Sequence, residues 1–426
     1  MKPEIKQRIE QIHQSEIPEA YKKTKAGILP GDWDVYMLGD CLSRVERPVE
    51  VKPNELYTQI GIRSHGKGLF YKEPVAGAAL GNKAVFWIEP DCFIVNIVFA
   101  WEQAIGKTTQ SEVGMIGSHR FPMYRPVNDR VDIDYLISYF LTKRGTDILE
   151  AASPGGAGRN KTLGQDRFLK SKIVLPPIEE QQKIAAILTT QDRVIELKEK
   201  RLAEKQRQKK YLMQQLLTGK KRLPGFSEEW KIKPLKKLTE KQKKKNHGFQ
   251  YRLVLSNSAQ HGIVSQDQEF DKEIANEERI DGYYVVIPGA FVYNPRISVT
   301  APCGPINVNE TGETGIMSPL YTVFTISSPQ ISQDFLKYYF QSSCWYKYVK
   351  GVANYGARHD RISISDGDFF DMPIPLPTKE EQSYIAKVLS ASNREIELLQ
   401  QDIEQEKQKK KALMQLLLKG IVRVKI

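Results

Sequence analysis

A segment of 49 residues occurs twice in this chain with an offset of 201 residues, and this repeat constrains the fold more than any other feature. The first copy begins at Leu175 with LPPIEEQQKIAAIL, and the second begins at Leu376 with LPTKEEQSYIAKVL. About 21 of the 49 aligned pairs are identical, and the alignment needs no gap through Gly219 and Gly420. The chain is therefore expected to consist of two related units.

The repeated segments have the periodicity of paired helices. Apolar residues recur at alternating steps of three and four, which is typical of a coiled-coil seam. Pro177 and Pro377 are expected to open the helices, and Gly219 and Gly420 to close them. Each helix would contain about 40 residues and be roughly 60 Å long. The predicted seam consists of Ile195, Leu202, Leu212 and Leu216 in the first copy and Ile396, Leu399, Ile403, Leu413 and Leu417 in the second.

The charges at the helix centres indicate how these helices pair. The stretch from Lys198 to Lys210 is strongly basic, whereas Asp402, Glu404 and Glu406 make the second centre more acidic. Antiparallel pairing would place the two centres side by side. The alternative is that the charges form a solvated face and that the helices form a trimer or pair with a partner protein.

The segments between the helices differ in sequence but have the same order of landmarks. β-rich runs such as Val85–Ile88 and Tyr283–Ile287 alternate with Gly, Pro and Asn turns. An amphipathic helix is predicted near Ile133–Leu149 in the first segment and near Ser332–Val349 in the second. The expected fold class is α+β, with two mixed α/β domains separated by a pair of long antiparallel coiled-coil helices. The expected boundaries are 1–28 for an N-terminal helical segment, 29–174 and 223–375 for the domains, and 175–222 and 376–426 for the helical regions.

The end of the N-terminal segment is similar in sequence to the exit of the first long helix. YKKTKAGILPGDW leads into the first domain much as LLTGKKRLPGFSEEW leads into the second. We therefore expect the N-terminus to supply the counterpart of that helix exit.

Composition narrows the class of protein. The 426 residues suggest two or three domains, and 63 Lys and Arg against 51 Asp and Glu give a net charge of +12, which favours a polyanionic partner. No apolar run approaches the roughly 18 residues of a membrane helix, and the N-terminus lacks the apolar region of a secretion signal. The four cysteines are far apart without a C-x-x-C pair, so neither a zinc site nor a disulfide framework is expected. This pattern indicates a protein of the reducing cytoplasm.

This layout resembles the specificity subunit of Type I restriction–modification systems. The resemblance is carried by the L-P-x-x-E-E-Q segments at Leu175–Gln181 and Leu376–Gln382 and by the heptads after them. Gly289–Arg296 (GAFVYNPR) and Ser318–Phe324 (SPLYTVF) resemble motifs of the family's target-recognition domains. The first domain is a looser match, through Phe93–Ile97.

The resemblance implies a non-catalytic subunit that binds double-stranded DNA. Each domain would be a target-recognition domain for one half of a split, asymmetric site, and the coiled coil would set the gap between the halves. Two methyltransferase subunits would bind to the helices, and restriction (translocase) subunits would join that complex. S-adenosylmethionine, ATP and Mg²⁺ would be bound by these partners and not by this chain.

The first candidate for DNA contact is the glycine-rich stretch Gly61–Gly68. It nearly fits the phosphate-binding pattern G-x-x-x-x-G-K-[ST], but Gly68 replaces the hydroxyl residue and a strand-like LFYKE follows. A DNA-contacting loop is therefore favoured over a nucleotide site, with an ordinary tight turn as the alternative. Its candidate residues are Arg63, His65 and Lys67.

Other candidates lie in basic loops and runs. Residues 153–161 and 351–361 form Gly-containing loops at the same place in each unit, where Arg can pair with guanine and Asn with adenine. Solvent loops and solvated charge runs are the alternatives. The candidates in the loops are Arg159, Asn160, Lys161, Tyr355, Arg358, His359 and Arg361, and those elsewhere are Arg296 and the basic run Lys243, Lys244 and Lys245.

An enzyme would need residues that the sequence lacks. The N-P-P-[YF] motif of base methylation is absent, since Asn294-Pro295 is followed by Arg296. There is no H-E-x-x-H motif, and the six histidines are scattered, so no catalytic residues and no metal site are expected. A self-contained methyltransferase or nuclease and a purely structural coiled-coil scaffold are the alternative functions.

Overall fold

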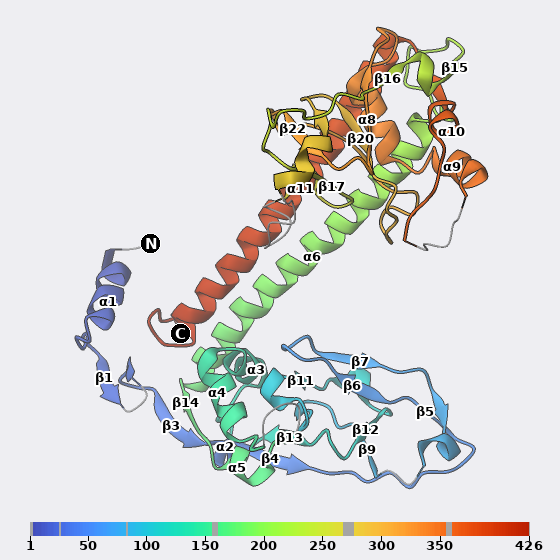
Figure 1. Cartoon of the computed structure of the whole chain (residues 1–426). Coiled ribbons are helices and arrows are strands. Elements are labelled where there is room, and N and C mark those ends of the chain that lie inside the picture. The colour runs from blue at the N-terminus through green and yellow to red at the C-terminus, as the bar shows by residue number, and fades with distance from the viewer. Residues whose placement is uncertain are drawn as a thin grey trace. The chain divides into compact units, whose positions relative to one another are not determined.

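The computed structural model describes residues 3–24, 27–81, 84–155, 161–266, 277–354 and 360–425. The chain divides into two compact units (Figure 1). Unit 1 comprises Met1–Lys198 together with Asp402–Ile426, and unit 2 comprises Glu199–Gln401. Each unit thus contains one globular domain and one stretch of each long helix.

The two long helices follow the predicted boundaries closely. Helix α6 covers Ile178–Leu216 and helix α11 covers Lys379–Leu417, with 39 residues in each. Gly219 and Gly420 follow with φ angles of +70° and +68°, a left-handed conformation that glycine adopts without strain. The N–H groups of Lys221 and Val422 donate to the carbonyls of Gln215 and Leu416 and so satisfy the last turns.

In each unit a stretch of α6 lies beside a stretch of α11 (Figure 1). In unit 1, Lys198 pairs with both Asp402 and Glu406 at 2.8 Å, while Gln191, further back along α6, donates to Glu406. Residues with lower numbers on α6 contact residues with higher numbers on α11, and the hydrogen bond from Lys410 to Asp192 continues this trend. The pairing is therefore antiparallel, as predicted. In unit 2, Lys205 pairs with Glu395 at 2.8 Å.

The helix centres carry the complementary charges that the sequence indicated. Hydrogen bonds from Lys198 and Gln191 lower the pKa of Glu406 to about 2, and the two carboxylates raise the pKa of Lys198. All nine predicted seam residues are buried or half-buried. The charged centres therefore pair with each other instead of forming a solvated face.

Both units contain a four-stranded antiparallel sheet with the same strand order. In unit 1 the order is β11-β10-β13-β4, and in unit 2 it is β21-β20-β23-β16. The strands of the first sheet are β4 (Leu42–Val45), β10 (Phe93–Val95), β11 (Ile105–Lys107) and β13 (Met123–Pro126). Those of the second are β16 (Thr239–Lys241), β20 (Phe291–Tyr293), β21 (Ile306–Val308) and β23 (Thr322–Ile326).

Two further strand pairs have counterparts in both units. Strand β9 (Val85–Trp87) pairs with β12 (Ile116–Ser118), as β19 (Tyr284–Val286) pairs with β22 (Gly315–Met317), which agrees with the β-rich runs predicted there. Strand β3 (Asp34–Met37) pairs with β14 (Lys172–Leu175), as β15 (Lys231–Pro234) pairs with β24 (Pro373–Leu376). The remaining pairs of the two domains are β5 (Leu56–Tyr57) with β8 (Val75–Ala76), β6 (Ile60–Ile62) with β7 (Leu69–Tyr71), and β17 (Leu255–Ser258) with β18 (Gly262–Ser265).

The prediction of a single amphipathic helix in each domain is wrong in one respect, because each domain has two consecutive helices there. In unit 1 these are α3 (Ile133–Phe140) and α4 (Lys143–Ala151), and in unit 2 they are α8 (Gln333–Gln341) and α9 (Tyr346–Val352). The hydroxyl of Thr142 accepts from the N–H of Gly145 and starts α4 as a new helix. A Cβ at Gly145 would lie 2.2 Å from the carbonyl oxygen of Tyr139, so the tight junction requires glycine. The short helices of the domains are α2 (Leu38–Cys41), α5 (Gln165–Leu169) and α10 (Asp366–Phe370).

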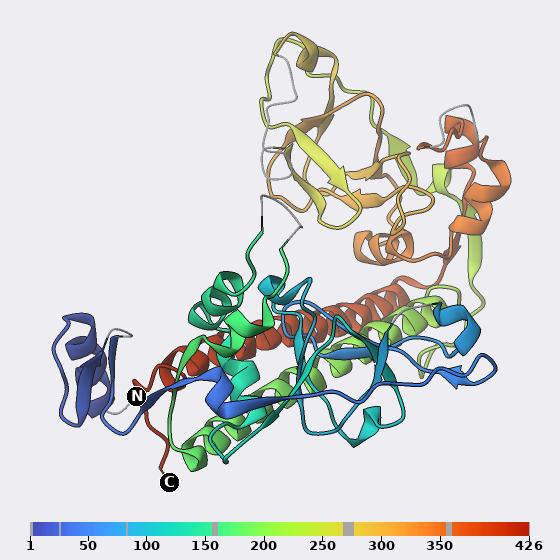
Figure 2. The same ribbon diagram turned by 90° about the horizontal axis from the view of Figure 1, so that it is seen from below.

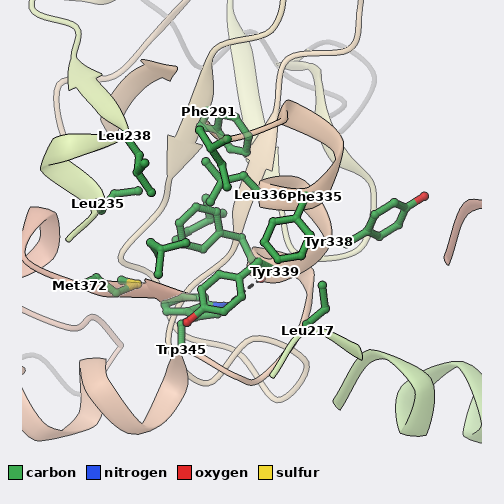
Figure 3. Packing of buried hydrophobic residues seen from close by; sticks show 14 of the residues in the cluster. Leu217, Leu235, Leu238, Phe291, Phe335, Leu336, Tyr338, Tyr339, Trp345 and Met372 are labelled. Carbon is green, nitrogen blue, oxygen red and sulfur yellow. Dashed lines mark hydrogen bonds between the residues drawn. The ribbon is translucent and has the colours of Figure 1, made fainter. Parts of the chain in front are cut away.

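The helices of each domain share a core with the ends of the long helices. In unit 1, Leu136 and Phe140 of α3 pack in one cluster with Leu188 of α6 and Leu417 of α11. In unit 2, Phe335 and Leu336 of α8 cluster with Leu217 just after α6 (Figure 3). Each globular domain is thereby fixed to its own stretch of the long helices.

The N-terminal segment departs from the prediction of a helical segment over residues 1–28. Helix α1 covers only Pro3–His13, and β1 (Tyr21–Thr24) pairs with β2 (Gly27–Pro30) as a hairpin. The tyrosine hydroxyl of Tyr21 donates to the carbonyl of Gly420 at 2.6 Å, and Arg8 donates to that of Ile421. The N-terminus therefore packs against the segment that follows α11.

Candidate nucleic-acid interface

The glycine-rich stretch of the first domain is the turn of the β6–β7 hairpin. Arg63, His65 and Lys67 are all exposed on it. His65 and Gly66 have φ angles of +61° and +63°, as a tight turn requires. A strand and not a helix follows the turn, so the turn lacks the helix N-terminus that a phosphate-binding loop presents to its phosphate.

This turn is held against the short helix Ala100–Glu102. The N–H groups of His65 and Gly66 donate to the carbonyls of Glu102 and Gln103 at 2.8 and 2.9 Å. The ammonium of Lys161 lies 5.2 Å from the ring centre of Trp101 on the same short helix. The structure thus brings the β6–β7 hairpin and the end of the predicted loop at residues 153–161 together beside this short helix. Arg159 and Asn160 lie outside the described residues.

In unit 2 the structure brings Arg296 and Arg361 together. They face each other across an antiparallel bridge, with Ile297 donating to the carbonyl of Asp360 at 3.0 Å. Arg296 is exposed and Arg361 is half-buried. The candidates Tyr355, Arg358 and His359 lie outside the described residues.

The two loop sites have the same backbone construction. After β10 the side chain of Asn96 accepts from the N–H of Val98 at 3.1 Å, and after β20 that of Asn294 accepts from Arg296 at 3.0 Å. The carbonyl of the following residue, Ile97 or Pro295, accepts from the segment that follows the loop, through the N–H of Leu163 at 2.8 Å or of Ile362 at 2.9 Å. Each unit therefore presents its loop at an equivalent turn.

A polar cavity adjoins Arg296 and was not predicted. Its volume is about 370 Å³. Asn257, 2% exposed, braces it by donating to the carbonyl of Val292 at 2.7 Å and accepting from Asn307 at 2.7 Å. The amide and hydroxyl side chains that line the cavity come from several segments, so no spacing in the sequence predicts the site. They include those of Ser256, Gln266, Tyr283, Asn294 and Tyr321.

The basic run at the start of the second domain is extended and exposed. Lys243, Lys244 and Lys245 all present their side chains to solvent. The carbonyl of Lys244 accepts from the N–H of Val285 at 2.9 Å, and Lys245 forms a bridge with Tyr284. The backbone is therefore fixed at a sheet edge while the three ammonium groups remain available for phosphates.

Buried ion pairs hold each domain on its helices, and sequence reasoning missed them. In unit 1, Glu180 is fully buried and accepts from Trp33 at 3.1 Å and from the guanidinium of Arg423 through both oxygens at 2.7 Å. The signal that could have revealed this is Arg423 itself, which matches Arg222 at the 201-residue offset. We name each such Trp–Glu–Arg arrangement a latch.

The latch of unit 2 has the same geometry. Glu381 is fully buried and accepts from Trp230 at 2.9 Å and from Arg222 through both oxygens at 2.7 Å. Arg423 follows α11 and Arg222 follows α6. The prediction that the N-terminus supplies the counterpart of the α6 exit is therefore wrong. The residues after α11 provide the latch arginine of unit 1, as the residues after α6 provide that of unit 2.

The glutamine after each latch glutamate fixes a second element. Gln181 donates to the carbonyls of Pro176 and Arg130 and accepts from the N–H of Asp132, which caps α3. Gln382 makes the same contacts with Pro377, Gln330 and Ser332, which caps α8. The repeated E-E-Q motif is therefore a structural joint between helix and domain.

The described residues also bear on metal, disulfide and membrane sites. Within the described ranges, no group of three or more His, Cys, Asp or Glu side chains is placed to hold a metal ion. All four cysteines are free. None of the helices in the described part of the chain combines the length and apolar character that a membrane crossing requires.

Comparison with known proteins agrees with this architecture. Residues 87–206 match the family model of the Type I restriction modification DNA specificity domain. The chain is 25% identical to a putative Type I restriction enzyme MjaX specificity subunit and 24% identical to the MjaVIII specificity subunit, both of Methanocaldococcus jannaschii, over 96% of this chain and 97% of each relative. The HsdS subunit from Thermoanaerobacter tengcongensis has a similar fold, with a TM-score of 0.53, 18% identity and coverage of 92% of this chain and 98% of that one.

The duplicated domains, the paired helices and these comparisons define a DNA-specificity protein of a Type I restriction–modification system. The matched family model and the two relatives, which align over 96% of the chain, support its identification as a specificity subunit of such a system. These subunits are non-catalytic, so the chain is not itself an enzyme.

Proposed function

We propose that the chain recognises a bipartite, asymmetric DNA site, with the target-recognition domain of each unit reading one half. The observation that carries this proposal is the equivalent turn after β10 and β20, against which each unit sets a basic segment. Lys161 and the β6–β7 turn are the candidates in unit 1, and Arg296, Arg361 and the lysine run at 243–245 are those in unit 2. Arginine reads guanine through a bidentate fork, and the lysines bind phosphates.

We further propose that two methyltransferase subunits dock on the helices and that restriction subunits join through them. Exposed apolar residues at matched positions of the two helices support this proposal. Ile187 of α6 and Val388 of α11 are 38% and 36% exposed, and Leu197 and Leu398 are 50% and 48% exposed. Equivalent apolar patches suit two copies of one partner. S-adenosylmethionine, ATP and Mg²⁺ would then be bound by the partners.

Exchange of one domain tests the division of the site between the units. If residues 29–174 are replaced by the first domain of another specificity subunit, one half of the methylated sequence should change and the other half should remain. The donor should carry tryptophan at the position of Trp33, because this indole donates to Glu180 in the latch. Sequencing of methylated DNA from cells with the partner subunits gives the result. A change in both halves, or in neither, would contradict the two-reader arrangement.

Arg296 and the lysine run should differ in what they read. Substitution of Arg296 by alanine should weaken binding to the recognised sequence by about 1–3 kcal/mol and leave binding to random DNA nearly unchanged, if its fork contacts a base. Lys244→Ala is the matched control, which should weaken both kinds of binding and reduce the salt slope by about one. Fluorescence anisotropy over a range of salt concentrations separates the two effects. An equal loss on both DNAs for Arg296→Ala would assign this side chain to phosphate.

A further inference from the structure

A groove in unit 1 combines an apolar floor with a basic rim. Its volume is about 670 Å³, and it lies between the β1–β2 hairpin, the α3–α4 junction and the end of α11. Half-buried Ile12, Ile28, Leu141 and Met414 contribute apolar surface. Among the described residues, every charged residue that lines the groove is basic: Lys143, Arg144, Lys407, Lys410, Lys411 and Lys419.

Part of this positive charge has no acidic neighbour to balance it. Lys143 pairs with Asp147 at 2.6 Å, and Lys410 pairs with Asp192 at 2.5 Å. Lys411 and Lys419 are exposed, and the described part of the chain offers neither of them an ion pair. A ligand of this groove should therefore bring carboxylates to the rim as well as apolar groups to the floor.

The second repeat does not preserve the lining of this groove. At the 201-residue offset, Gln206 and Thr218 stand where unit 1 has Lys407 and Lys419. Counting from the aligned Tyr139 and Tyr339, Gln341 replaces Leu141, and Ser343 and Cys344 replace Lys143 and Arg144. Met213, the counterpart of Met414, is 7% exposed. Both components of the groove, apolar and basic, are therefore reduced in the second repeat.

The N-terminal hairpin forms one wall and is fixed in place. Its strands pair from Tyr21 opposite Pro30 to Thr24 opposite Gly27, and the hydroxyl of Tyr21 bonds to the carbonyl of Gly420 beyond α11. The guanidinium of Arg8 lies 5.4 Å from the Tyr21 ring centre and bonds to the carbonyl of Ile421. The wall is thus tied to the same chain segment that carries the latch residue Arg423.

We propose that this groove binds a segment of one methyltransferase subunit that presents apolar side chains flanked by aspartate and glutamate. The inference rests on the proposed docking of two methyltransferase subunits and adds that the two are held differently. DNA phosphates would match the rim but would leave the apolar floor in contact with water, so a protein segment fits both parts of the groove. The apolar patches on the helices are shared by both units, whereas this groove serves one.

Charge reversal at matched positions of the two repeats tests the proposal. The variant Lys411→Glu, Lys419→Glu should weaken the binding of one methyltransferase subunit by at least about tenfold and leave the other unchanged. The control variant Lys210→Glu, Thr218→Glu alters the equivalent positions of the first repeat and should leave both unchanged. Native mass spectrometry gives the number of bound subunits, and calorimetry gives the affinity of each. Leu141→Gln, which introduces the residue of the second repeat, should reproduce the loss without a charge change.

The outcomes separate this inference from the proposed function. If the unaltered chain binds no methyltransferase subunit, the proposed docking itself is overturned and the groove proposal with it. If two subunits bind and the groove variants keep both affinities, or if groove and control variants lose binding equally, only the groove proposal is overturned. A loss of DNA binding with unchanged methyltransferase binding would show that the groove is a nucleic-acid site.

Discussion

Replacing Arg423 by alanine should destabilise unit 1 by about 3 kcal/mol, because it leaves the fully buried carboxylate of Glu180 without its cation. The indole of Trp33 would still donate one hydrogen bond to that carboxylate, which sets the loss at the lower end of the range for broken buried pairs. Hydrogen–deuterium exchange resolved to peptides measures the effect, since it reports the free energy of opening for each unit separately.

The second repeat supplies the control for this substitution. Arg222→Ala removes the same bidentate contact from Glu381 and should raise exchange in unit 2 instead of unit 1. Adding Glu180→Gln to Arg423→Ala removes the buried charge and should recover part of the lost stability. If Arg423→Ala changes the free energy of opening by less than about 0.5 kcal/mol, which is typical of a surface substitution, the latch does not hold the domain.

Features with a strong local signal were predicted correctly from the sequence. The heptads, with Pro177 before one helix and Gly219 and Gly420 after both, gave helix boundaries that agree with the structure to within about two residues. Antiparallel pairing followed from the charges around Lys198 and Glu406, which form an ion pair at 2.8 Å. Such signals are reliable because the residues that determine the structure are close together in the chain or repeat with a fixed period.

Features that depend on distant residues could not be predicted. The latch joins Glu180 to Arg423, and the polar cavity beside Arg296 takes its lining from separate segments of the second domain. The break between α3 and α4 was missed because Leu141 and Ile148 keep a heptad spacing on either side of Thr142, whose hydroxyl starts the second helix. The hairpin at residues 21–30 was missed because it is too short to show a clear alternation. The DNA-contact residues stay predictions, since fold alone does not identify the bases read.

Lengthening both long helices should lengthen the unread gap in the proposed bipartite DNA site, because α6 and α11 connect the two target-recognition domains. The division between the units falls after Lys198 in α6 and after Gln401 in α11, so one heptad inserted at each point leaves every contact within each unit in place. The pair of Lys198 with Glu406 stays in unit 1, and that of Lys205 with Glu395 stays in unit 2. A heptad keeps the seam in register and adds about 10 Å.

At about 3.4 Å per base pair along B-DNA, this insertion should add roughly three base pairs to the gap and leave both half-sequences unchanged. Three base pairs also rotate one half-site by roughly 0.3 of a turn relative to the other, so methylation should be slower even where binding persists. Sequencing of methylated DNA from cells that carry the lengthened chain and its partner subunits measures the gap directly. The matched control places a heptad in α6 alone, which leaves the helices unequal in length and should abolish methylation. An active variant that carries both heptads and retains the original gap would show that the helices do not set the spacing.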